Sequence, residues 1–242
     1  MQFGIFLLTL IAYGLAFFLW YRERTPNYVI GLLAGHLFSL ASPLWQMLYR
    51  FSYNSQWAPL YTAFGHMLPR LTFVAAWTFM IPPLLIFFLY RNRWWEPSYL
   101  IGLLTFALFV VYYLIIESFG LRSDWWQYSD VGTLPLGMQV TLLSALMNGL
   151  VALGSLSILI MTRRYAWLSL LLLLLPMPLI LSLFVNGLLG APLYTVFLLR
   201  EQLQAQSWPG VIGMIGTLGL LFWGAHIVAS AFEGQRAERG VV

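Results

Sequence analysis

The chain has 242 residues, of which 61% are hydrophobic and only 8% are charged, and its formal net charge is +4. Soluble domains carry roughly 25% charged residues, so a water-soluble fold of this size is excluded. The absence of Cys removes disulfides, thiolate chemistry, iron–sulfur clusters and Cys-based zinc sites. All 12 basic residues are Arg, and without a Lys the chain cannot form a retinal Schiff base.

Long apolar runs fill nearly the whole sequence. A run of about 20 apolar residues is long enough to span a bilayer as a helix. The sequence therefore predicts an all-α membrane protein, a single bundle of seven transmembrane helices over residues 1–242, with no soluble domain. The predicted spans are residues 3–21, 29–49, 67–90, 99–118, 138–162, 167–189 and 210–232.

Arginine pairs fall in alternate connections between these spans and in the C-terminal tail. Because Arg-rich connections stay on the cytoplasmic side, this pattern predicts an N-out, C-in orientation, and we expect a bacterial inner (plasma) membrane location. The first span has no basic region before it and no small-residue cleavage site after it, so we expect a retained signal anchor. The positive charge then serves orientation and contact with anionic membrane lipids, and nucleic acid is not an expected partner. The pairs are Arg22/Arg24, Arg91/Arg93, Arg163/Arg164 and Arg236/Arg239.

Small residues and prolines predict where the helices pack and bend. Gly31, Gly35 and Ser39 line one stripe of the second span, and Gly213 with Thr217 lines the seventh, so backbones can approach closely there. Proline pairs, at residues 82–83 in the third span and at 176 and 178 in the sixth, predict kinks.

Glu117 is the acidic residue that lies at the edge of a predicted span, whereas the others lie in connections or in the tail. Burial beside apolar side chains favours the protonated carboxyl, which is what a general acid acting on a hydrophobic substrate needs. Glu117 is therefore the first candidate for catalysis. The alternative is a Glu at the membrane interface that is solvated or paired with Arg122.

A polar stripe follows the fifth predicted span, where Thr141, Ser144, Asn148 and Ser155 recur at helical spacing. One interpretation is hydrogen bonding between helices. The other is the wall of a cavity for a mostly apolar ligand, in which Ser144 and Asn148 bind substrate and Asn186 on the sixth span joins them.

The connection after the fourth span gathers further candidates. Asp124 and Asp130 are candidate catalytic carboxylates beside Trp125, Trp126 and Tyr128, whose ring faces would shield a carbocation. The alternatives are solvated loop aspartates and an aromatic belt at the head groups.

Three histidines complete the ionisable groups in or near the spans. His66 and Arg70 are predicted one helical turn apart, where they could share a carboxylate or a phosphate of the substrate. A haem held by His36 and His226 is not expected, because paired His motifs are missing, and no metal or other cofactor is predicted.

Part of the sequence around Glu117 resembles membrane enzymes of carotenoid biosynthesis, namely the carotenoid hydratases and, more distantly, the transmembrane lycopene cyclases. The resemblance covers about twenty residues and implies proton-initiated addition or cyclisation on a long polyene, with Glu117 and Asp130 in the acid or base roles. The matching stretches are residues 117–120 (ESFG), 126–130 (WQYSD) and 134–137 (LPLG).

Three functions remain open at this stage. The first is an enzyme that acts on an isoprenoid, carotenoid-like or other lipid-soluble substrate by acid–base chemistry. The second is a non-catalytic subunit of a respiratory or photosynthetic membrane complex, whose apolar flanks contact partner proteins. The third is a seven-helix transporter or receptor, which usually needs more ionisable groups at mid-membrane than this chain offers. The expected partners are membrane lipids, a hydrophobic small molecule and possible membrane proteins.

Overall fold

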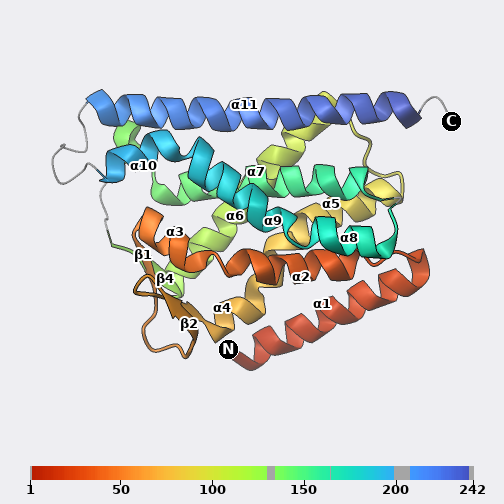
Figure 1. Ribbon diagram of the computed structural model, residues 1–242, viewed down its shortest axis with the longest axis horizontal. Helices are drawn as coiled ribbons and strands as arrows, with labels where there is room; N and C mark the ends of the chain where they lie inside the picture. Colours follow the sequence, from red (N-terminus) through yellow and green to blue (C-terminus); the bar gives the residue numbers. More distant parts are fainter. Residues whose placement is uncertain (1, 130–133, 164, 199–207, 240–242) are drawn as a thin grey trace. The chain divides into compact units, whose positions relative to one another are not determined.

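The computed structural model describes residues 2–129, 134–163, 165–198 and 208–239. The chain is 77% helical, which confirms the predicted helical class (Figure 1). Within the described ranges, six helical segments are long and apolar enough to cross a membrane. These segments are Phe3–Glu23, Arg70–Arg91, Tyr99–Arg122, Val140–Met161, Trp167–Leu189 and Trp208–Gly234.

The second predicted span is broken rather than continuous. It consists of α2 (Asn27–Ser39) and α3 (Ser42–Tyr49), which are bent by 49° at a short break, and counting this pair as one span gives seven. Pro43 lies at the start of α3, has no backbone N–H to donate and clashes with the carbonyl one turn before it. The bend therefore follows from the sequence at residues 40–43.

The described chain divides into two compact units. Unit 1 comprises Met1–Trp95, Asp124–Ser129 and Ser155–Ile180, and unit 2 comprises Glu96–Ser123, Asp130–Gly154 and Leu181–Val242.

In unit 1, helix α2 packs against the third span through small residues. A Cβ on Gly31 would lie 2.7 Å from a methyl carbon of Leu84, and one on Gly35 would lie 2.6 Å from the Ala76 carbonyl oxygen. The small-residue packing predicted for Gly31 and Gly35 is thus confirmed. The unit's helices are α1 (Gln2–Glu23), α2, α3, α4 (Arg70–Ala75), the 3-10 helix η1 (Ala76–Met80), α5 (Ile81–Arg91), α8 (Trp167–Leu174) and the first part of α9 (Met177–Ser182).

At the prolines predicted to bend the third and sixth spans, one helical element ends and the next begins. Pro82 and Pro83 occupy the first turn of α5, where their missing N–H groups cost nothing, and the 3-10 turn of η1 comes directly before them. Pro176 lies between α8 and α9. Both spans are therefore composite helices.

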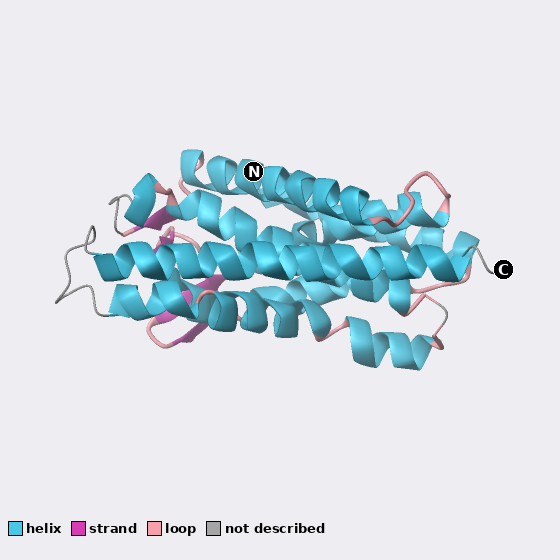
Figure 2. Cartoon of the chain, turned by 90° about the horizontal axis from the view of Figure 1, so that it is seen from above, coloured by secondary structure: helices cyan, strands magenta, loops and turns pink. Residues whose placement is uncertain are grey.

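Unit 1 also contains four short strands (magenta in Figure 2), in segments that the sequence analysis assigned to connections and to the start of the third span. Phe64 and Gly65 form the turn between the two strands of the second pair, and their φ angles are positive, at 55° and 76°. Burial raises the pKa of Tyr61, and its hydroxyl donates a hydrogen bond to the Leu40 carbonyl. Strand β1 (Phe51–Tyr53) pairs antiparallel with β4 (Trp126–Tyr128), and β2 (Pro59–Ala63) with β3 (His66–Pro69).

The predicted start of the third span at residue 67 is wrong, because His66–Pro69 forms strand β3 and the helix begins at Arg70. Pro69 disfavours a helical conformation for the residue before it, and Pro69 itself is extended with ψ of 145°. Pro69 is therefore the extended N-cap residue of α4, and the helix begins after it.

Unit 2 packs two helices against the long C-terminal helix α11 (Trp208–Arg239). Gly102 of α6 (Tyr99–Arg122) lets that helix approach α11, since a Cβ there would lie 3.0 Å from the Ala229 Cβ. The Leu193 N–H of α10 (Ala191–Leu198) donates to Thr217 Oγ1 of α11 over 3.2 Å. Thr217 thus serves helix packing, as predicted. The unit also holds the 3-10 helix η2 (Pro135–Gly137), α7 (Val140–Met161) to Gly154, and the π-helix η3 (Leu183–Leu189).

The close approach at Gly35 gives a first test of the fold. We expect Gly35→Ala to lower stability by about 1–3 kcal/mol, because the added methyl group meets backbone atoms that cannot move aside. Thermal unfolding of the detergent-purified protein would measure the loss. The matched control is Gly14→Ala in α1, where a Cβ would have nothing within 4 Å. Equal unfolding temperatures for the two variants would contradict the packing at Gly35.

Candidate functional site

Glu117 lies in the second-last turn of α6, within unit 2, and its side chain is only 9% exposed. The buried face of this helix continues one and two turns earlier with Tyr113 and Phe109. The carboxyl is therefore buried among the helices rather than solvated at an interface, whereas Arg122 is exposed. A buried ionisable residue in a membrane span is costly, and such residues commonly mark functional sites.

Helix α7 provides hydrogen bonds to this carboxyl. Ser144 Oγ donates to Glu117 Oε1 over 2.5 Å, and Asn148 Nδ2 donates to Ser144 Oγ over 3.4 Å. The polar stripe on α7 and the carboxyl on α6, which the sequence presents as separate features, thus form one network. The predicted hydrogen bonding between helices is observed at Ser144.

The other members of the predicted stripe lie apart from this network. Thr141 Oγ1 is 3.5 Å from the Gln139 side-chain oxygen, so its contact is local. Ser155 belongs to unit 1, where with Gly31 and Met80 it lines a small apolar cavity of about 10 Å³. That volume is about enough for one water molecule and far below the roughly 300 Å³ of a small ligand pocket.

A π-helix that the sequence analysis did not predict brings Asn186 into the core of unit 2. The Asn186 side chain is buried and donates to the Ser182 carbonyl and hydroxyl oxygens over 3.0 and 3.1 Å. The Tyr194 hydroxyl lies 3.9 Å from Sδ of Met147. Met147 is on α7, between Ser144 and Asn148 of the network. π-Helical turns are rare and frequent at functional sites.

The candidates from the connection after α6 fall in unit 1, apart from Asp130, which lies outside the described residues. Asp124 is exposed, and its Oδ1 accepts a hydrogen bond of 3.4 Å from Gln127 Nε2. The aromatic residues belong to β4 and its flank and pack on aromatic rings across the sheet. Trp125 packs edge-on against Trp57 at 5.6 Å between ring centroids, and Trp126 packs edge-on against Tyr53 at 6.3 Å. Tyr128 packs against Phe51 at 5.9 Å in a tilted arrangement.

The predicted pairing of His66 and Arg70 on one helical turn is wrong, because His66 belongs to strand β3. Arg70 begins α4, and its Nε donates to the Pro59 carbonyl over 3.2 Å. The strand ends at Pro69, so the two residues share no helix face. Their proposed joint role in binding an anion loses its geometric basis.

The two remaining histidines contact partners within their own units. His36 Nδ1 in unit 1 lies 2.7 Å from the Phe73 carbonyl oxygen, and His226 Nδ1 in unit 2 lies 3.0 Å from the Tyr99 hydroxyl. In the described part of the chain, no group of three or more His, Asp or Glu side chains could hold a metal ion.

Comparison with known proteins provides no relative of this chain. No family model matches it, and neither the curated proteins nor the solved structures give a match. The candidate site therefore rests on burial and hydrogen bonding, and these point to Glu117 with Ser144 and Asn148.

The bond between Ser144 and Glu117 can be tested through stability. We expect Ser144→Ala to destabilise the protein by about 1–3 kcal/mol, because a buried carboxyl then loses a hydrogen-bond donor. The control is Ser230→Ala on α11, whose hydroxyl is exposed and donates to a backbone carbonyl within its own helix. We expect that change to stay within about 0.5 kcal/mol. Thermal unfolding in detergent measures both, and no excess loss in Ser144→Ala would contradict the network.

Proposed function

We propose that the protein is a seven-span integral membrane protein of the bacterial inner membrane, oriented N-out and C-in. Six apolar helical segments and the bent pair α2–α3 among the described residues support the number of spans. The arginine pairs support the orientation: Arg22 lies in the last turn of α1 and Arg24 just after it, Arg91 ends α5 and Arg93 follows it, and Arg163 follows α7.

We propose further that it is an enzyme that acts by acid–base chemistry on an isoprenoid or carotenoid-like lipid-soluble substrate. The observation that carries this proposal is the buried carboxyl of Glu117, joined to Ser144 on the neighbouring helix. In its protonated form this carboxyl is a proton donor in apolar surroundings, and a polyene partitions into the same surroundings.

The chemistry begins with transfer of the carboxyl proton to one carbon of a substrate double bond. The double bond breaks, a C–H bond forms, and the neighbouring carbon becomes a carbocation while Glu117 is left as a carboxylate. Ser144 stabilises that carboxylate by donating its hydroxyl hydrogen. The cation is then captured by water or by another double bond of the substrate, and the proton that is lost returns to the Glu117 carboxylate, which restores the starting acid.

A second candidate function is a subunit of a larger membrane complex, and the exposed surface of helix α1 is compatible with it. Only 6% of the residues in the most apolar stretch of α1 are buried. Phe3, Leu10 and Tyr21 are each more than 70% exposed. Such a surface fits lipid or a partner helix equally well. Purification from the native membrane in mild detergent separates the two functions, since stoichiometric partner proteins support the subunit and a lone chain carrying a polyene supports the enzyme.

The catalytic role of Glu117 is tested by Glu117→Gln. This change keeps the shape and the hydrogen bond from Ser144 but removes the acidic proton, so we expect turnover of a polyene substrate to fall at least 100-fold, the usual order for loss of a general acid. Product formation in membranes from cells that accumulate acyclic carotenoids would be followed by chromatography. The matched control is Glu233→Gln on α11, an exposed residue that should leave turnover unchanged. Full turnover in Glu117→Gln would refute the proposal.

The orientation is tested with single cysteines, because the chain has none of its own. We expect Ser55→Cys, between β1 and β2, to react with a membrane-impermeant maleimide in intact cells. Trp94→Cys, at an exposed position after α5, should react only once the cells are opened. The reverse labelling pattern would overturn the N-out orientation.

A further inference from the structure

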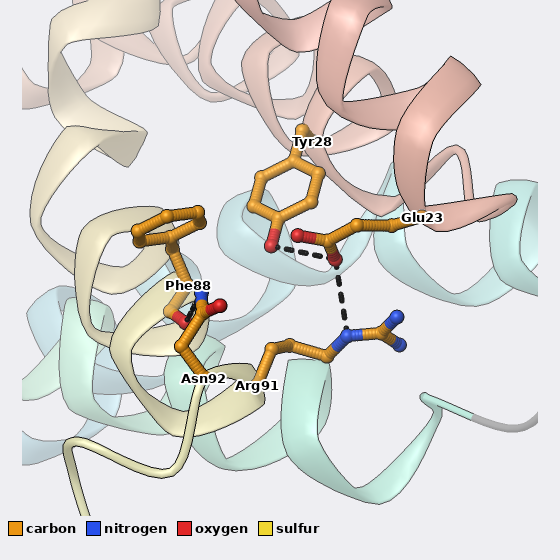
Figure 3. A network of polar contacts seen from close by, with 5 residues as sticks. All are labelled: Glu23, Tyr28, Phe88, Arg91 and Asn92. Carbon is orange, nitrogen blue, oxygen red and sulfur yellow. Dashed lines mark hydrogen bonds and ion pairs between the residues drawn. The ribbon is translucent and has the colours of Figure 1, made fainter.

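A polar cluster lies at one end of unit 1, where α1 ends, α2 begins and α5 ends (Figure 3). The side chain of Arg91 forms an ion pair with Glu23, in which Arg91 Nε is 3.0 Å from Glu23 Oε2. The Tyr28 hydroxyl donates to the same oxygen over 3.1 Å. Glu23 is thereby neutralised and fixed in place by two donors.

Aromatic rings pack against one another beside this cluster. The Tyr28 ring contacts Phe87 at 5.7 Å between centroids, Phe87 contacts Tyr90, and Tyr90 contacts Trp95. The guanidinium of Arg163 lies over the Tyr90 ring at 5.5 Å from its centroid. Aromatic rings thus pack beside the cluster, while the Arg91 side chain keeps 29% of its surface exposed.

Two side chains in the connection between α1 and α2 are buried there without hydrogen-bond partners. Asn27 is 0% exposed, and neither its amide nitrogen nor its amide oxygen has a partner. Thr25 is 7% exposed, and its hydroxyl also has none. Each such group costs about 1–3 kcal/mol when it is left unpaired, so a site of this kind is stabilised by a ligand that fills its hydrogen bonds.

The same residues lie at the start of a helix without a side-chain cap. Asn27 is the first residue of α2, and Pro26 before it makes no capping hydrogen bond. The first backbone N–H groups of a helix have no partner within the helix, and the helix dipole makes this end positive. A buried, uncapped helix start with an unpaired amide beside it favours an oxygen-rich anion.

The charge around the cluster agrees with an anion. Arg22 and Arg24 flank Glu23 in sequence, and Arg91 meets Glu23 through Nε, as Figure 3 shows. A guanidinium carries five N–H donors, so the terminal nitrogens of Arg91 remain available for a second acceptor. The side chain of Arg91 is 29% exposed and is therefore accessible to a ligand from solvent or from the lipid surface.

We propose that this cluster binds a phosphate group, through the Asn27 amide, the Thr25 hydroxyl, the first N–H groups of α2 and the guanidinium of Arg91. The ends of two apolar helices meet here, which places the site at head-group level in either orientation of the chain. Two sources provide the same chemistry there, the phosphate of a glycerophospholipid and free phosphate. The site is separate from Glu117 and does not depend on the proposed enzyme activity.

The test is thermal unfolding of the full-length protein in detergent with three additions: dioleoylphosphatidylglycerol, dioleoylglycerol, which has the same chains but no phosphate, and inorganic phosphate at constant ionic strength. A ligand that binds the folded state raises the unfolding temperature. We expect the phospholipid to raise it and dioleoylglycerol to have no effect. A rise with inorganic phosphate as well identifies free phosphate as a sufficient ligand, whereas a rise with the phospholipid alone identifies the lipid as the source.

Two variants at one position tie the effect to the cluster. Asn27→Asp keeps the shape but adds a negative charge, and Asn27→Leu removes the unpaired amide without leaving a cavity, so both should raise the half-saturating concentration at least tenfold. The control Arg93→Gln removes an arginine two residues after Arg91, in the connection that follows α5, and should leave that concentration unchanged. The proposal is overturned if no phosphate compound shifts wild-type unfolding, or if Asn27→Asp and Asn27→Leu respond as the wild type does.

Discussion

A polar group in apolar surroundings must find a partner inside the protein, and this constraint governs the structure more than any other. Helices satisfy it for the backbone within each segment. For side chains it concentrates the few polar residues at a small number of contacts, such as Ser144 with Glu117 and Arg91 with Glu23. Where such a contact joins two helices, it fixes their depth and rotation relative to each other, which apolar packing alone determines less sharply.

The parts of the fold that depend on local sequence could be predicted. The sixth predicted span, residues 167–189, has the ends of the observed segment Trp167–Leu189, because an apolar run of the right length is a property of consecutive residues. The parts that depend on distant residues could not. Strand β1 pairs with β4, which lies more than seventy residues later in the chain. The local sequence of neither segment indicates which segment it pairs with. The break in the second span was readable in principle from Pro43.

The candidate site was predictable to the same extent. Glu117 stood out because carboxyls are rare in apolar segments, and Ser144 stood out as one member of a stripe. Their contact depends on how α6 and α7 are rotated and on their relative depth, which a single sequence does not contain. The buried amide of Asn27 was harder to foresee, because residues beside a proline in a short connection are usually solvated.

The hydrogen-bond partners of Glu23 and Glu117 differ in a way that bears on their roles. Glu23 faces a guanidinium, which only donates hydrogen bonds, so the pair is satisfied when Glu23 is ionised and is broken when it is protonated. Glu117 faces a hydroxyl, which both donates and accepts, so Ser144 can keep a hydrogen bond to the carboxyl in either protonation state. A group that gains and loses a proton during a reaction needs a partner of the second kind. Glu23 therefore fits a structural role, and the hydroxyl partner of Glu117 is compatible with the proton transfer that we propose for it.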